Sequence, residues 1–191
     1  ATRYRGVTSC HLAGLVAGDT IAARVVPCDD RFRLPLDQRA IVVAAGTGLA
    51  PFRGMVADRR DPVADTPPSA PLTLYFGCDH PDVDFLHRTE LEEAERDGVV
   101  SLRPAYTYAP VDGHRFAQDR MVADADHVWS ELQRGAHLRV CGDAARLGAG
   151  VDDALRTIYL RCAPDSARTD AAATEWIAAL RRDHRYVSDV W

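Results

Sequence analysis

The chain has 191 residues, of which 47% are hydrophobic and 27% are charged, a composition typical of a globular protein with one full core. The formal net charge is −5, and no apolar run reaches the length of a membrane span or a signal peptide. These features argue against a nucleic-acid-binding surface and a membrane segment. The five cysteines form no C-x-x-C pair, so we expect a reduced, cytoplasmic chain without a disulfide framework or a metal site.

The first 38 residues have a different pattern from the rest. A turn is expected at 18–19, a strand at 21–26 and a short edge segment at 32–35. The sequence also opens without a methionine. We therefore expect residues 1–38 to be the closing part of a β domain that begins upstream, and residues 39–191 to form a second domain.

Strand and helix patterns alternate from residue 39 onward. Apolar strands are expected at 40–45, 72–76, 99–106, 137–141 and, as a short last strand, 186–191. Helices are expected at 50–60, 84–97, 118 to about 133, 143–161 and 169–183. This alternation predicts an α/β fold with a doubly wound, five-stranded parallel sheet of the Rossmann-like type.

A glycine-rich segment, Gly46-Thr47-Gly48, follows the first expected strand and leads into a helix whose first turn holds Pro51. In a doubly wound sheet, ligands bind at the carboxyl ends of the strands. The glycines would let the backbone approach a pyrophosphate, and the helix N-terminus would offer N–H donors to it. A plain tight turn is the alternative, but the position between a strand and a helix favours a phosphate loop.

Several other residues are expected at strand ends. Asp143 suits the N-cap of a helix, and Cys141 is either a buried structural thiol or a group that touches a reacting atom. Phe76 and Tyr106 either belong to the core or stack on adenine. At the end of the sequence, the indole of Trp191 either fills the core or covers a flat cofactor.

Taken together, the motifs resemble the diflavin reductases, the NADPH–hemoprotein reductase type within the ferredoxin–NADP reductase superfamily. The reductase part of a self-sufficient heme monooxygenase is one protein of this type. The resemblance runs in order along nearly the whole chain. It is carried by segments 46–54, 74–78, 84–86, 135–137, 140–143, 185–186 and 189–191.

The resemblance implies that residues 1–38 are the last strands of an FAD-binding β-barrel and that residues 39–191 bind NAD(P)H. The flavin pyrophosphate segment would be Gly6, Val7, Thr8 and Ser9. It also implies NADPH and FAD as cofactors, with FMN in an upstream domain. Hydride would pass from nicotinamide to FAD, and electrons would then pass through FMN to a heme or similar acceptor in the same parent chain.

The resemblance further implies roles for individual residues. Trp191 would stack on the flavin and yield to nicotinamide, and Cys141 would pack beside the reacting carbon. Asp189 would position the nicotinamide ring and stabilise its developing positive charge. Thr47 would lie near the pyrophosphate and the nicotinamide.

The region that would bind the adenosine 2′-phosphate departs from the family pattern, because basic residues are lost there. The positions concerned hold Cys78, Asp79, Thr107, Tyr108, His114, Arg115, Phe116 and Gln118, with Asp79 replacing an arginine. Charged contacts to phosphate are among the stronger polar contacts, so the loss of several is expected to weaken NADPH binding by roughly tens- to thousands-fold. Arg115 and His114 would compensate in part. NADPH and NADH therefore both remain open as the nucleotide.

Two functions fit the sequence. The first is an oxidoreductase domain within a larger flavoprotein, and the second is a nucleotide-binding regulatory module without electron transfer. Asp189 and Trp191 favour the first. The family's Arg-x-Tyr-Ser flavin motif is absent from these residues, so we expect the isolated chain to bind nucleotide without holding FAD tightly.

Overall fold

The computed structural model describes residues 6–26, 32–61 and 70–191, and it contains one parallel sheet with the strand order β3-β2-β1-β4-β5. The strands are β1 (Ala40–Ala45), β2 (Leu72–Cys78), β3 (Ser101–Tyr106), β4 (His137–Gly142) and β5 (Tyr186–Val190). The chain runs outward from β1 to β3 and then returns past β1 to β4. The strand order therefore reverses beside β1, which is where an open sheet of this kind binds ligands. The predicted fold class is confirmed.

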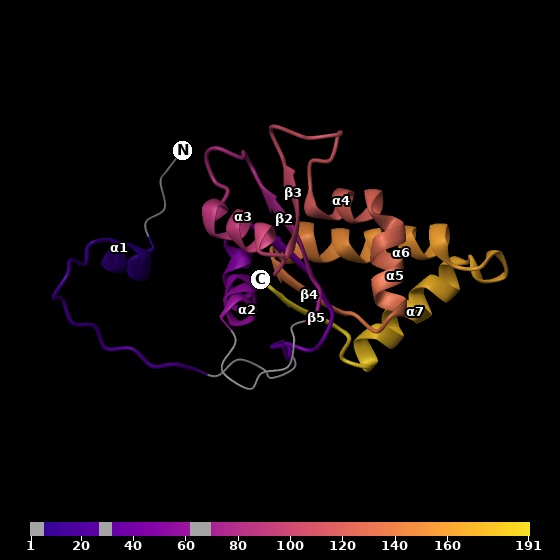
Figure 1. The fold of residues 1–191 in the computed structure, drawn as a ribbon, viewed down its shortest axis with the longest axis horizontal. Helices are drawn as coiled ribbons and strands as arrows, with labels where there is room; N and C mark the ends of the chain where they lie inside the picture. Colours follow the sequence, from indigo (N-terminus) through magenta and orange to yellow (C-terminus); the bar gives the residue numbers. More distant parts are fainter. Residues whose placement is uncertain (1–5, 27–31, 62–69) are drawn as a thin grey trace.

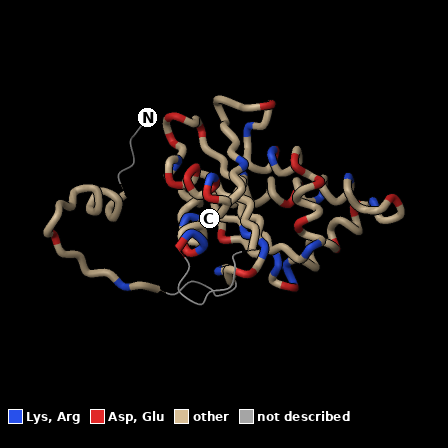
Figure 2. Tube along the Cα trace, in the orientation of Figure 1, with Lys and Arg blue, Asp and Glu red and all other residues tan. Residues whose placement is uncertain are grey.

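Helices cover both faces of the sheet (Figure 1). One face carries α2 (Ala50–Arg60) and α3 (Arg88–Arg96). The other carries α4 (Ala117–Ala123), α5 (Ala125–Gln133), α6 (Ala149–Cys162) and α7 (Asp170–Arg182). Figure 2 shows that the charged residues concentrate on the helices and loops around the sheet. Among the described residues, no helix has the length and hydropathy needed to cross a membrane.

The central strand β1 separates the two cores. Its side chains alternate between the faces, so that Val42 and Ala44 pack with α2 and α3, whereas Ile41 and Val43 pack with the helices opposite. These four residues have no exposed surface. A strand buried on both faces must be apolar throughout, which is why residues 40–45 were recognisable from sequence.

Two of the predicted helices are divided or shortened. The stretch expected to be one helix up to residue 133 forms α4 and α5, which meet at Asp124. The Asp124 carboxylate accepts a hydrogen bond from the Tyr75 hydroxyl (3.3 Å) and pairs with Arg103 (3.2 Å), and these contacts tie the junction to β2 and β3. The helix expected from residue 84 begins only at Arg88, because Asp84 is used to hold the preceding turn.

The segment 6–26 contradicts one expectation. It contains the short helix α1 (Val7–Ala13), followed by extended chain with no strand, so the strand predicted at 21–26 is wrong. A strand needs a neighbour for its N–H and C=O groups, and no described residue pairs with this segment, whose side chains are exposed. Gly6 is the N-cap of α1, and Val7, Thr8 and Ser9 form its exposed first turn. The assignment of these residues to a flavin-binding barrel stays a prediction.

The short segment before β1 is also not a strand. Residues 32–35 form a turn and an irregular stretch, but Phe32 and Leu34 are buried. Phe32 stacks on Phe52 of α2 with 5.8 Å between the ring centroids. This apolar contact joins the chain that enters β1 to the core on the α2 side of the sheet.

Candidate functional site

A cavity of about 430 Å³ opens at the carboxyl edge of the sheet. Its walls come from the ends of β1 and β2, the loops that follow β3 and β4, and the first turn of α4. Of the residues predicted to bind a cofactor, the cavity brings together Gly46, Cys78, Asp79, Thr107, Phe116, Gln118 and Asp143. They are distant in sequence but close in space because parallel strands end at the same edge.

Some predicted residues lie outside this cavity wall, and some lining residues were not predicted. The residues outside it are Gly6, Val7, Thr8, Ser9, Thr47, Gly48, Pro51, Tyr108, His114, Arg115, Cys141, Asp189 and Trp191. The lining residues that were not assigned to the site are Ala45, Gly77, Asp84, Ala117, Arg146 and Leu147. Asp84 belongs to a recognised motif and could have been found from it, whereas no pattern in the sequence marks Arg146.

The glycine-rich loop forms a 3-10 turn, η1 (Gly46–Leu49), between β1 and α2. Gly46 has φ +52, a left-handed conformation that favours glycine. Gly48 is required for a different reason: a Cβ atom there would lie 2.1 Å from the carbonyl oxygen of Cys141. The loop therefore packs directly on the end of β4. Thr47 is exposed, and Pro51 lies in the first turn of α2, as expected.

Cys141 and Asp189 face each other in register across β4 and β5. Cys141 is 3% exposed, and burial together with the charge of Asp189 raises the pKa of its thiol to about 11. Cys141 is therefore an uncharged thiol at neutral pH, suited to packing and not to acting as a nucleophile. The Asp189 carboxylate is on an exposed residue at the same edge.

Trp191 follows β5 and its indole is 64% exposed, so the alternative that it fills the core is wrong. Its backbone is held on two sides. The Trp191 N–H donates to the Gly142 carbonyl (3.2 Å), and the Trp191 carbonyl accepts from the Ala144 N–H (2.9 Å). An exposed flat ring on a fixed backbone can turn about its side-chain bonds without displacing β5.

The turn after β2 is stabilised by Asp84. Its two carboxylate oxygens accept hydrogen bonds from the Asp79 N–H (2.8 Å) and the His80 N–H (2.7 Å). Burial raises the pKa of the neighbouring Cys78 thiol to about 12, with Asp84 and Asp79 adding to the shift. Cys78 is thus neutral, and this wall of the cavity carries two carboxylates.

The loop between β3 and α4 is held close to β2. The Thr107 N–H donates to the Cys78 carbonyl (2.9 Å), and the Tyr108 N–H donates to the Asp79 carbonyl (3.0 Å). The Arg115 guanidinium donates to the Thr107 carbonyl (3.2 Å), so this arginine braces the loop. The ring of Tyr108 is 72% exposed. This wall therefore offers hydroxyl, amide and aromatic groups, and no cation, to the cavity.

Asp143 caps the helical segment after β4, as predicted. Its carboxylate accepts a hydrogen bond from the Arg146 N–H (2.8 Å). The first turn, η2 (Ala144–Gly148), is π-helical and leads directly into α6. This turn places Arg146 and Leu147 on the cavity wall.

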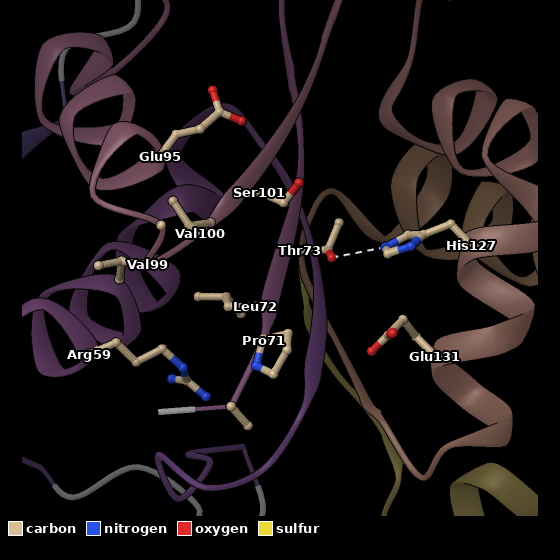
Figure 3. A pocket seen from close by; sticks show the side chains of 12 residues that line it. Arg59, Pro71, Leu72, Thr73, Glu95, Val99, Val100, Ser101, His127 and Glu131 are labelled. Carbon is tan, nitrogen blue, oxygen red and sulfur yellow. Dashed lines mark hydrogen bonds between the residues drawn. The ribbon is translucent and has the colours of Figure 1, made fainter. Parts of the chain in front are cut away.

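A second cavity, of about 510 Å³, lies beside the amino-terminal ends of β2 and β3 (Figure 3). Figure 3 shows Thr73 and His127 pointing toward each other, and their side chains are 3.1 Å apart. Glu131, on the same wall, receives two hydrogen bonds from Arg39 (2.9 and 3.0 Å). Thr73, His127 and Glu131 are thus engaged by protein partners, and this cavity has no glycine-rich loop, so the cavity at the carboxyl edge is the candidate site.

Comparison with known proteins shows which family the chain belongs to. Residues 42–152 match the family model described as the oxidoreductase NAD-binding domain. The chain belongs to this family. The matched range runs from β1 into α6 and includes the glycine-rich loop and every wall of the cavity. The sequence-based assignment to an NAD(P)H-binding part of an oxidoreductase is confirmed.

Relatives of this NAD-binding domain are much longer proteins. The chain is 35% identical to the bifunctional cytochrome P450/NADPH–P450 reductase 2 of Bacillus subtilis over 98% of its length, and it spans 18% of that protein. It is 34% identical to the bifunctional cytochrome P450/NADPH–P450 reductase of Fusarium oxysporum over 99% of its own length, and it spans 18% of that protein. It is 39% identical to a self-sufficient cytochrome P450 monooxygenase of Oidiodendron maius over 82% of its own length, and it spans 15% of that protein. The domain thus resembles one part of fused P450 reductases.

Proposed function

We propose that this domain binds NADPH, or NADH, at the carboxyl edge of its sheet and supports hydride transfer to FAD within a larger flavoprotein. Electrons would then pass through FMN to a heme acceptor in the same parent chain. The observation that carries the proposal is the convergence of the glycine-rich loop, the Cys141–Asp189 pair and the exposed Trp191 at one edge. The relatives, which are named as fusions of P450 with an NADPH-dependent reductase, support it.

The residues present fit a dinucleotide. The left-handed Gly46 and the start of α2 provide a cradle of backbone N–H groups in which a side chain is not needed. The 430 Å³ cavity beside it offers Phe116 and Gln118 as apolar and hydrogen-bonding walls for an adenosine. The exposed indole of Trp191 provides a flat surface for the ring of nicotinamide or flavin.

Nicotinamide and flavin, when bound, supply the hydride chemistry, so the protein contributes position and electrostatics. Cys141 keeps a neutral, polarisable thiol beside the reacting ring, because its raised pKa prevents ionisation. The negative charge of Asp189 would stabilise the positive charge that develops on nicotinamide. The indole of Trp191 would shield the site from water when no nicotinamide is bound, while the backbone hydrogen bonds of Trp191 keep the end of β5 in place.

The proposal is tested in the parent flavoprotein by anaerobic stopped-flow measurement of flavin reduction. Cys141→Ser is expected to slow reduction by about tenfold or more while changing nucleotide affinity little, since it alters packing at the reacting ring. Cys162→Ser, which changes a thiol in α6 outside this edge, is the control. Trp191→Ala is expected to change the ratio of NADH to NADPH use.

Nucleotide binding without flavin reduction would favour the regulatory module instead. Affinity lost in Cys141→Ser, with the rate unchanged, would place Cys141 in binding and contradict its proposed role. Wild-type protein that binds neither NADPH nor NADH would overturn the proposed function as a whole.

A further inference from the structure

The charges on the cavity wall are unevenly distributed. The charged residues that line it are three aspartates, Asp79, Asp84 and Asp143, and one arginine, Arg146. Asp84 and Asp143 already accept hydrogen bonds from backbone N–H groups. Within the described residues, Arg146 is thus the one permanent cation on the wall.

The guanidinium of Arg146 is also available. Arg146 is exposed, and no carboxylate oxygen in the described part of the chain lies within 4.0 Å of its guanidinium nitrogens. The arginines of the β3–α4 region are engaged elsewhere: Arg115 donates to the Thr107 carbonyl, and Arg120 of α4 pairs with Asp124 (3.7 Å). The hydrogen bond from the Arg146 N–H to Asp143 fixes the backbone from which the side chain extends.

The position of Arg146 relative to the other walls indicates which phosphate it meets. The pyrophosphate is expected at Gly46 and the start of α2, where backbone N–H groups suffice. Thr107 and Phe116 line the same cavity from the loop after β3, which β2 and β1 separate from β4 in the sheet. This is the loop in which the family resemblance implies the adenosine 2′-phosphate. That loop brings no cation to the cavity, and a phosphate dianion needs one.

We propose that Arg146 is the residue through which this domain recognises the 2′-phosphate of NADPH, from the β4–α6 side of the cavity. The inference rests on the proposed nucleotide-binding function. A guanidinium presents two parallel N–H groups that match two phosphate oxygens. Arg146 therefore replaces, from a different wall, basic groups lost from the β3–α4 loop, and it counteracts the repulsion from Asp79.

The test is isothermal titration calorimetry of the 191-residue chain with 2′,5′-ADP and with 5′-ADP, which differ in the 2′-phosphate. Arg146→Gln is expected to weaken 2′,5′-ADP binding about tenfold or more and 5′-ADP binding less than about threefold. Arg146→Lys should restore part of the difference, because a point charge remains. Arg96→Gln, which removes an exposed arginine from α3, is the control and should change neither affinity.

The outcomes are distinct. Equal weakening of both ligands in Arg146→Gln would overturn the inference and assign Arg146 to the pyrophosphate. Unchanged affinities in that variant, with wild-type protein binding both ligands, would overturn the inference and leave the proposed function standing. Wild-type protein that binds neither ligand would overturn both. Circular dichroism of each variant verifies that it is folded.

Discussion

The two edges of the sheet use polar residues in opposite ways. At the amino-terminal edge they are paired with each other, as Thr73 is with His127 and Arg39 is with Glu131. At the carboxyl edge, Arg146 and Asp79 are exposed beside a cavity, and a glycine-rich loop leaves the backbone open. Both edges hold a cavity, so the volume of a cavity does not by itself identify a site. A site is identified by polar groups that are free to contact a ligand. Substitutions at the amino-terminal edge should therefore change stability, and substitutions at the carboxyl edge should change nucleotide binding.

The largest effect is expected for Gly48→Ala, at the carboxyl edge. The new Cβ would lie 2.1 Å from the carbonyl oxygen of Cys141. Relieving this clash requires the backbone of β4 to move, which costs much more free energy than moving a flexible side chain. We expect the free energy of unfolding to fall by about 3 kcal/mol or more, and nucleotide binding to be lost with it. Urea denaturation measures the change.

Gly54→Ala is the matched control for that substitution. Gly54 is in α2, and no atom outside its helical neighbourhood lies within 4 Å of the position of a new Cβ. Alanine should therefore stabilise the helix by about 0.5–1 kcal/mol. If the two variants had equal stability, close packing of the loop on β4 would not be the reason for glycine at position 48.

A smaller effect is expected for Glu131→Gln, at the amino-terminal edge. Glu131 is 6% exposed, and its bond to Arg39 lowers the pKa of its carboxyl group below the usual 4.5. A lowered pKa in the folded state means that the pair stabilises the fold above about pH 4.5 and loses this contribution as the pH falls further. We expect Glu131→Gln to cost about 1–2 kcal/mol at pH 7, with nucleotide affinity unchanged.

Chemical denaturation from pH 7 down to pH 3 measures this dependence. The difference between wild type and Glu131→Gln should shrink as the pH falls below 4.5. The unfolded chain takes up a proton at Glu131 there, before the folded carboxylate with its lower pKa does. Glu175→Gln, which breaks a solvent-exposed pair with Arg182, serves as the control and should change stability by less than about 0.5 kcal/mol. A weakened affinity for 2′,5′-ADP in Glu131→Gln would contradict the division between the two edges.

The smallest effect is expected for Asp79→Asn. This change removes one negative charge from the wall that faces the proposed 2′-phosphate, without altering the size of the side chain. We expect affinity for 2′,5′-ADP to rise about three- to tenfold by calorimetry, with little change for 5′-ADP. Asp165→Asn, far along the chain in an exposed turn, controls for net charge. Equal gains in both variants would mean that the effect is not local.

Much of the fold was predictable from local patterns. Residues 40–45 were recognised as a buried strand and residues 50–60 as a helix, with the observed boundaries. The failures have physical causes. Residues 21–26 have strand-like side chains, but a strand also needs a pairing neighbour, which the described chain does not provide. Asp84 resembled a helix start, yet its carboxylate serves the turn before the helix.

The candidate site was predictable only in part. Gly46, Thr107 and Asp143 were identified because each follows a strand, and position after a strand can be inferred locally. Arg146 was missed because a single arginine in an arginine-rich sequence carries no signal of its own. The exposure of Trp191, which excludes core filling, required the packing of β5.

The sequence by itself therefore determined the alternation of strands and helices from residue 39 onward, the glycine-rich loop and the family, because hydrophobic periodicity and short motifs are properties of neighbouring residues. Only the tertiary structure decided which strand ends meet. By placing β1 between β2 and β4, it brought Gly48 against Cys141 and Arg146 into the same cavity as Thr107. These contacts join residues far apart in the chain, and they depend on how two cores pack against one sheet.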